Sequence, residues 1–199
     1  AADPGAEGEL AGNIASDHGG ILAMNANGFL DPNGGGDGSQ LAGWCMSNGE
    51  GHGTHFAGEA YQRIELSENG LDCRIVPASD PVGEGTYNAV EFTPVLIRDG
   101  EKIEDSFWTG EQPRACFGTS TQGIYMLVIE GRYPDEGIRG TSVNTCSDIL
   151  LSYGCRNALN MDGGSSAILW YDGEYVTQSS SSPLRYTGGR PLPNAWVYG

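Results

Sequence analysis

The sequence predicts an α+β fold with a mixed, largely antiparallel sheet and only two short helices. Three features lead to this prediction. Apolar residues alternate with polar ones over several short segments, Asp-Gly pairs separate some of these segments, and only two stretches have the spacing of an amphipathic helix. With 199 residues, the chain fits a single domain over residues 1–199 that is large enough to bury a sizeable core.

The first half of the chain is expected to begin with a short helix over residues 5–18, which ends at Gly19-Gly20. A buried strand is expected next, and then a glycine-rich loop of the kind that often carries a site. The expected elements up to the middle of the chain are a strand at 21–24, the loop at 31–39, strands at 61–66 and 71–77, and a hairpin over 95–103 turning at Asp99-Gly100.

In the second half, one more helix is expected, capped by Thr145 with Asp148 at the capping-box position and stopped by Gly154. Its apolar residues Cys146, Ile149, Leu150 and Tyr153 share one face. The remaining expected elements are strands at 115–119, 124–130 and 195–198, and a hairpin formed by 167–171 and 174–177 around Asp172-Gly173.

The charge of the chain excludes two classes of partner. The formal net charge is −16, and ten basic residues spread along the chain cannot offset it against the phosphates of nucleic acid or an anionic membrane. No apolar stretch has the roughly 20 residues of a membrane-spanning helix, so no membrane span is expected, and the first residues lack the pattern of a signal peptide.

Lys102 is the only lysine. The other basic residues are arginines, which grip phosphate and carboxylate groups through two donors.

The most informative segment is 160–166, which reads NMDGGSS. An apolar run ends in Asp162, and Gly163 and Gly164 then allow a tight turn that frees backbone N–H groups beside one carboxylate. The hydroxyl groups of Ser165 and Ser166 follow directly. An ordinary Asp-Gly hairpin turn is the alternative for this segment taken alone.

The five cysteines lack any Cys-x-x-Cys spacing, which disfavours a zinc ribbon. We expect Cys146 to pair with Cys155 and Cys45 with Cys73, leaving Cys116 free, in an oxidising compartment. Five reduced cysteines are the alternative.

Other polar groups are weaker candidates for sites. Asp31, Asn33 and Asp37 alternate as in a calcium loop, but Ala42 stands where an EF-hand has its closing glutamate, so the candidate here is an irregular calcium site. His52 and His55 lack an evident third metal ligand, and a polar loop is the alternative reading. The four tryptophans fit sugar stacking or core packing, and no organic cofactor is expected.

Three arginines lie next to expected strand ends: Arg114, Arg132 and Arg190. If the sheet brings these ends near Asp162, one carboxylate is surrounded by guanidinium groups, which suits a sugar phosphate.

At these motifs the chain resembles the phosphodiester glycosidases, relatives of the animal uncovering enzyme that removes N-acetylglucosamine from mannose phosphate. The resemblance rests on five ordered segments: NANGFLDPNG from Asn25, PRACFG, EGR, NMDGGSS and RPLPNA. It implies that the site is lined by Asn25, Arg114, Glu130, Arg132, Asp162 and Arg190. Glu130 stands where relatives usually have aspartate, and Cys116 replaces a small alanine.

The expected activity is hydrolysis of a glycosyl-1-phosphodiester on a secreted or cell-surface protein, with a phosphorylated glycan or glycolipid as substrate. Asp162 is the expected base or nucleophile, Arg114 and Arg132 bind phosphate, and Asn25 orients sugar hydroxyls. The competing prediction is a non-catalytic surface or filament subunit. Relatives usually have further strands upstream, so an open sheet edge would allow strand donation and a homo-oligomer.

Overall fold

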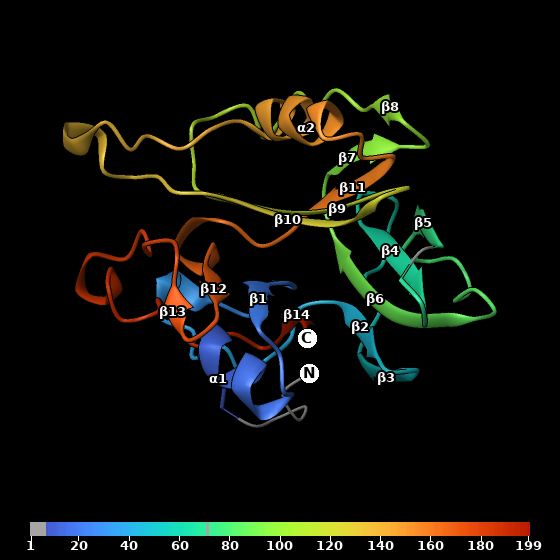
Figure 1. Ribbon diagram of the computed structural model, residues 1–199, viewed down its shortest axis with the longest axis horizontal. Helices are drawn as coiled ribbons and strands as arrows, with labels where there is room; N and C mark the ends of the chain where they lie inside the picture. Colours follow the sequence, from blue (N-terminus) through green and yellow to red (C-terminus); the bar gives the residue numbers. More distant parts are fainter. Residues whose placement is uncertain (1–6, 71) are drawn as a thin grey trace.

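The structure is a computed structural model that describes residues 7–70 and 72–199. It is an α+β fold in which three antiparallel sheets surround a common core and two α-helices lie outside (Figure 1). Residues 5, 6 and 71, which belong to an expected helix and an expected strand, lie outside the described residues. The helices are α1 (Ala11–Asp17) and α2 (Val143–Ser152). Short 3-10 turns occur at Pro32–Gly34, Pro134–Glu136, Gly164–Ser166 and Ser182–Leu184.

The first sheet joins the two ends of the chain and has the order β13-β12-β1-β14. Its strands are β1 (Leu22–Asn25), β12 (Leu169–Tyr171), β13 (Glu174–Tyr175) and β14 (Ala195–Tyr198). Helix α1 covers its outer side by packing Ile14 against residues that include Ile168 and Trp170. Strand β1 lies in the interior of this sheet, so the segment that follows it leaves the sheet near the centre of the molecule.

The second sheet has the order β10-β9-β11-β7-β8 and lies under helix α2 (Figure 1). Its strands are β7 (Val95–Arg98), β8 (Glu101–Lys102), β9 (Arg114–Ser120), β10 (Gly123–Ile129) and β11 (Asn157–Asn160). Every residue of the interior strand β11 is buried. The sheet therefore holds the end of β11 rigidly, and with it the start of the loop that carries Asp162.

The third sheet has the order β3-β2-β6-β4-β5. Its strands are β2 (Trp44–Ser47), β3 (Glu50–Gly53), β4 (Gln62–Ser67), β5 (Cys73–Pro77) and β6 (Thr86–Phe92). The sequence predicts strands at β4 and β5 but not at β2, β3 and β6.

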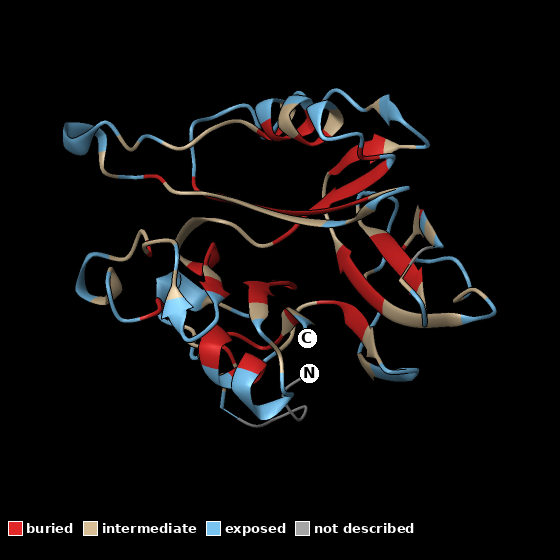
Figure 2. Ribbon diagram, in the orientation of Figure 1, coloured by how far each residue is buried: buried red, intermediate tan, exposed pale blue. Residues whose placement is uncertain are grey.

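The main core lies between the inner faces of the three sheets, where buried ribbon segments face one another in Figure 2. Met24 from β1, Ile64 from β4 and Phe117 from β9 meet there, and the Phe117 ring stacks on Trp196 of β14 with 4.0 Å between centroids. A separate cluster fills the space between the second sheet and α2. Burial of these apolar faces is the main stabilising term for such a fold.

Two of the expected hairpins are confirmed at Asp-Gly pairs. Asp99 and Gly100 have φ of +53° and +89°, and Asp172 and Gly173 have φ of +45° and +93°. Positive φ at both central positions is what a two-residue hairpin turn requires, and aspartate followed by glycine tolerates it best. These turns join β7 to β8 and β12 to β13.

The second helix starts earlier than expected. Ser142, and not Thr145, is its N-cap, because the Ser142 hydroxyl accepts a hydrogen bond from the Thr145 backbone N–H at 3.2 Å. Tyr153 is the C-cap and is exposed, so it does not share the buried face. Gly154 follows with φ of +79° and ends the helix as expected.

The cysteine pairing expected from the sequence is wrong, because all five cysteines are free thiols. Cys45 on β2 and Cys73 on β5 are separated by two intervening strands and are out of register by two residues, so they lie more than about 14 Å apart. The Cys146 thiol contacts that of Cys116, whereas the Cys155 Sγ lies against Gly118, two residues further along β9. The thiols of Cys146 and Cys155 therefore face different residues of β9.

Strand β10 is an edge of its sheet. Its seven residues are apolar apart from Gly123 and pair only with β9 among the described strands. One face packs toward α2 through Tyr125, Leu127 and Ile129, and the other packs toward the main core. An open edge is thus present, while strand donation through it stays a prediction.

Candidate functional site

Asp162 lies two residues beyond β11, where the ends of β11 and β1 meet. Its backbone N–H donates to the carbonyl of Ala26 at 3.1 Å, and its carbonyl accepts from Asn25 Nδ2 at 2.6 Å. A Cβ added at Gly28 would lie 4.0 Å from the Asp162 carboxyl carbon and 3.1 Å from the Phe92 ring. The carboxylate is therefore placed over a small floor formed by the segment after β1 and the end of β6.

Burial raises the pKa of Asp162 above its usual value of 3.8. Hydrogen bonds from the Ser166 hydroxyl and the Gly163 backbone N–H, and the charge of Arg190, act in the opposite direction but do not outweigh burial. The result is a carboxylate that takes up a proton more readily than an exposed aspartate does. That is the property expected of a general base.

The two glycines after Asp162 are required by close contacts on both sides of the loop. A Cβ at Gly163 would lie 2.8 Å from the carbonyl oxygen of Pro113, which accepts the Gly164 N–H at 3.0 Å. A Cβ at Gly164, whose φ is +59°, would lie 2.9 Å from Arg132 Nη2. The Asp-Gly-Gly, Pro-Arg and Glu-Gly-Arg segments, far apart in the sequence, therefore meet at this loop.

Arg132 lies over Gly164 and is exposed. Its backbone has φ of +71°, an uncommon conformation for a residue with a side chain. Nε donates to Gln112 Oε1 at 3.0 Å and Nη1 to Ser180 Oγ at 3.5 Å, so two neutral groups aim the guanidinium. Among the described residues it forms no ion pair with a carboxylate.

Arg114 lies at the start of β9 and is buried. Its Nε donates to the Thr141 carbonyl at 3.0 Å, and Nη2 donates to the carbonyls of Trp108 and Gly110 at 3.3 and 2.9 Å. Burial lowers the pKa of its guanidinium, and the nearby positive charge of Arg132 lowers it further. Among the described residues no carboxylate lies within ion-pair distance of Arg114, and the charge of Asp105 acts on it only from further away.

Arg190 has a different role from these two, because it is bound to a carboxylate. Its Nη1 and Nη2 donate to the two oxygens of Asp31 at 2.6 and 3.0 Å, and Nη2 also reaches the Gly36 carbonyl at 2.7 Å. Nη1 lies 3.4 Å from Ser165 Oγ. Arg190 therefore ties the glycine-rich loop after β1 to the loop that carries Asp162.

Two other expected site residues are engaged with the backbone. The Asn25 side chain is fully buried, with Nδ2 on the Asp162 carbonyl and Oδ1 accepting from the Ile168 N–H at 3.2 Å. Glu130 Oε1 accepts from the Gln178 N–H at 2.6 Å. Asn25 thus fixes the loop rather than facing solvent, and Glu130 anchors the serine-rich loop beside Arg132.

The acidic residues of the glycine-rich loop are also engaged. Hydrogen bonds from Arg190 lower the pKa of Asp31, while the Asp37 carboxylate accepts from the Ser39 hydroxyl and N–H at 2.6 and 3.0 Å. In the described part of the chain, no group of three or more histidine, cysteine, aspartate or glutamate side chains is arranged to hold a metal ion. The carboxylates of Asp31 and Asp37 thus already have partners within the protein, and a calcium ion bound by Asp31, Asn33 and Asp37 stays a prediction.

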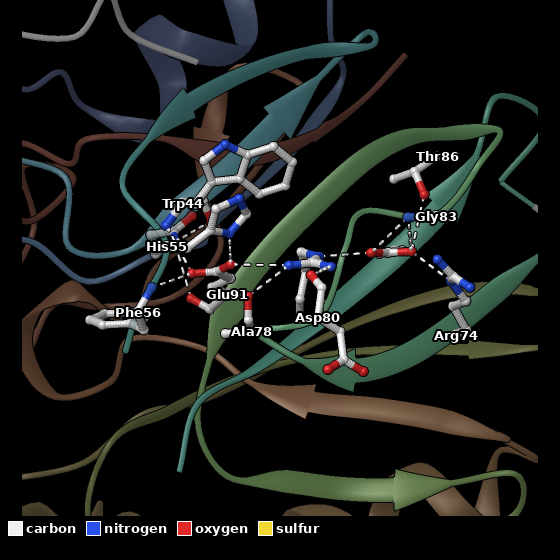
Figure 3. A network of polar contacts seen from close by, with 12 residues as sticks. Trp44, His55, Phe56, Arg74, Ala78, Asp80, Gly83, Thr86 and Glu91 are labelled. Atoms are coloured by element: carbon white, nitrogen blue, oxygen red, sulfur yellow. Dashed lines mark hydrogen bonds and ion pairs between the residues drawn. The ribbon is translucent and has the colours of Figure 1, made fainter. Parts of the chain in front are cut away.

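The third sheet contains a buried polar network that the sequence does not predict (Figure 3). Glu91 and Arg63 are both fully buried, and Arg63 donates to Glu65 Oε1 at 2.7 Å and to Glu91 Oε1 at 3.4 Å. His55 binds the same Glu91 oxygen through Nδ1 and stacks on Trp44, with 4.6 Å between centroids. The signal was present in β4, where Arg63 and Glu65 share one face because a strand repeats every two residues.

No helix in the described part of the chain is long and apolar enough to cross a membrane. The site consists of the partly buried Asp162 carboxylate at a strand end, the exposed Arg132 that lies over Gly164, and the buried Arg114 at the start of β9. In this arrangement the carboxylate can accept a proton, and the arginines beside its loop can stabilise an anion.

Comparison with known structures agrees with this architecture. The catalytic domain of zebrafish N-acetylglucosamine-1-phosphodiester alpha-N-acetylglucosaminidase, auto-inhibited by its pro-peptide, superposes with a TM-score of 0.72 and 16% identity, over 96% of this chain and 67% of that chain. A hypothetical protein from Synechocystis gives 0.62 and 16%, over 98% and 54%. At these identities the likeness establishes the fold.

A protein from Burkholderia pseudomallei proposed to be exported gives a TM-score of 0.62 and 13% identity, over 99% of this chain and 69% of that chain. The chain thus spans between about half and about two thirds of these three structures. A search of curated proteins gave no match. The family model described as phosphodiester glycosidase matches residues 18–198, which is nearly the whole chain, so the chain belongs to the phosphodiester glycosidase family.

Proposed function

We propose that this protein hydrolyses a glycosyl-1-phosphodiester, releasing a sugar from a phosphate-linked glycan or glycolipid. The observation that carries the proposal is the pair Arg114 and Arg132, which lies beside the Asp162 loop and has no carboxylate within ion-pair distance among the described residues. In a chain of net charge −16, an anion can bind only where cations are clustered, and these two neighbouring arginines form such a cluster. A phosphodiester supplies that anion.

In the proposed reaction Asp162 acts as a general base. It takes a proton from water, the water oxygen bonds to the anomeric carbon, and the bond from that carbon to the phosphate oxygen breaks with its electron pair. The departing phosphomonoester has a second pKa of about 6, far below about 16 for water, so arginines can stabilise it without a strong general acid. One carboxylate and two cations then suffice, in contrast to the two carboxyl groups of most glycosidases.

The residues divide into contact and positioning roles. Arg132 contacts the phosphate because its guanidinium is exposed, and Arg114 adds charge from beneath while holding the segment 108–110. The Gly163 N–H and the Ser165 hydroxyl border the sugar side of the loop. Asn25 and Arg190 position this loop through its backbone and through Ser165. Export to the cell surface is part of the proposal and is supported by the similarity to a protein proposed to be exported.

The test is incubation with the methyl phosphodiester of N-acetylglucosamine-1-phosphate in water enriched in oxygen-18. We expect free N-acetylglucosamine that carries the label at its anomeric hydroxyl, and unlabelled methyl phosphate. Arg132→Met should abolish most turnover, whereas Arg139→Met, which removes another exposed arginine of the same loop, should not. Absence of free sugar, or label in the phosphate product, would refute the proposal.

A further inference from the structure

We propose that a cleft beside the Asp162 loop binds a pyranose ring of the group that lies beyond the scissile phosphate. The cleft has a volume of about 530 Å³ and lies between the third sheet and the segment 103–108. Its aromatic and charged lining is formed by Tyr61, Arg98, Asp105, Phe107 and Trp108. The inference rests on the proposed function, because it specifies the substrate of the same site.

Two aromatic residues of the cleft are exposed, and hydrogen bonds fix the backbone of the turn that carries them. Phe107 is 89% exposed and Trp108 42% exposed. Their backbone N–H groups both donate to Asp105 Oδ1, at 2.9 and 2.5 Å, and Asp105 is fixed to Asn144 of α2 by two hydrogen bonds of 2.9 Å. An ordered turn that presents two large apolar rings to solvent marks a binding surface.

The cleft also holds an arginine with few partners. Arg98 donates from Nη2 to Gln62 Oε1 at 2.7 Å, and its buried Nε has no hydrogen-bond partner among the described residues. Within the same residues Arg98 forms no ion pair. The Nε is closed off from the cleft, so the contribution of Arg98 to binding is a positive charge in the lining that no described carboxylate neutralises and that attracts the oxygen atoms of a ligand.

Hydrogen bonds join the cleft to the site on two sides. Thr93 and Pro94 line the cleft, and their carbonyls accept from Nδ2 and N of Asn160, two residues before Asp162, at 2.8 and 3.0 Å. On the other side, the Trp108 carbonyl accepts from Arg114, whose guanidinium carbon lies 5.8 Å from the Trp108 ring. A phosphate held by the two arginines therefore has the cleft as its next neighbour.

A sugar fits this cleft better than a lipid chain does. One face of a pyranose ring is made of C–H groups and packs on aromatic rings, while its hydroxyl groups reach polar side chains. Tyr61 offers such a ring, fixed by stacking on Phe56 with 3.7 Å between centroids. A prenyl chain would instead cover Arg98 and Gln62 without replacing their water, which is unfavourable.

The test measures binding without turnover. Cellobiose and diacetylchitobiose, two disaccharides without phosphate, are titrated into the protein and followed by saturation-transfer NMR and calorimetry. We expect Phe107→Ala and Arg98→Met each to weaken the affinity by about fivefold to tenfold. Tyr171→Ala, which removes an aromatic ring that is 51% exposed on β12, should leave the affinity unchanged. Geranyl phosphate, the lipid probe, should not displace the sugars.

Each contrary outcome overturns the inference. These outcomes are no binding of either disaccharide, unchanged affinity in both cleft variants, or displacement by geranyl phosphate. Because Phe107 is largely exposed, its replacement should not unfold the protein, and the unfolding temperature checks this. A protein that binds the disaccharides through the cleft but releases no sugar from a phosphodiester would refute the proposed function and keep the cleft assignment.

Discussion

Gly164→Ala separates the backbone conformation of the Asp162 loop from the placement of Arg132. The new Cβ would lie 2.9 Å from Arg132 Nη2 and 3.2 Å from Nη1, and ordinary contacts begin near 3.4 Å. The guanidinium must therefore withdraw by about 0.5 Å or more, and it is free to do so because it lies at the exposed end of a long side chain.

The size of each effect follows from this geometry. Gly164 has φ of +59°, so alanine there costs about 1–2 kcal/mol of folding free energy. A misplacement of 1 Å at a catalytic centre can cost about 100-fold in rate, so a shift of half that size should cost about tenfold in kcat/KM.

Gly19→Ala is the matched control. Gly19 has φ of +66°, nearly the same as Gly164, but an added Cβ would have no atom within 4 Å. Urea unfolding should show a similar loss of about 1–2 kcal/mol in both variants. Release of sugar from the methyl phosphodiester should fall only in Gly164→Ala. Equal activity in the two variants would refute the placement of Arg132 at the reacting phosphate.

Two further variants test the electrostatics. Asp162→Asn should abolish turnover and raise the free energy of unfolding at neutral pH. The pKa of Asp162 is raised in the folded state, so the wild-type protein loses stability as pH rises from 3.8 through the folded-state pKa, and the variant avoids this loss. A lower stability of the variant in chemical unfolding at pH 7 would contradict this. Glu91→Gln should cost about 3–5 kcal/mol, because it leaves the charge of buried Arg63 without one partner. The same change at Glu136, whose pair with Arg185 is exposed on the glutamate side, should cost less than about 1 kcal/mol, and equal losses in urea would show that burial does not govern these pairs.

The sequence was most informative where a local motif requires a local conformation. Asp-Gly turns at Asp99 and Asp172 and the double glycine after Asp162 could be predicted, because positive φ and close backbone approach leave few alternatives to glycine. The family resemblance is confirmed by the match over 18–198, and it was this resemblance that predicted that arginines far apart in the sequence lie near one loop. Spacing alone could not have done so, because nothing local to Arg132 shows that it lies over Gly164.

Long-range pairing accounts for what could not be predicted. Arg63 and Glu65 look like the solvent side of a strand until β6 supplies Glu91 on the same face, which makes them buried partners. The connectivity of five cysteines is likewise not contained in their spacing, since it depends on strand order. The helix cap is a smaller case. Ser142 and Thr145 are both suitable hydroxyl residues, and only the backbone geometry selects the first.

The ion pair between Asp31 and Arg190 connects positions that are 159 residues apart in the chain. Strand β1 is likewise completed only when β12 and β14 pair with it. During synthesis, the segment after β1 can therefore take its final shape only after the residues of β14 have left the ribosome. Contacts of such large sequence separation form slowly. The pocket floor should accordingly be among the last parts to form, and a chain cut shortly before Arg190 would leave it unfinished.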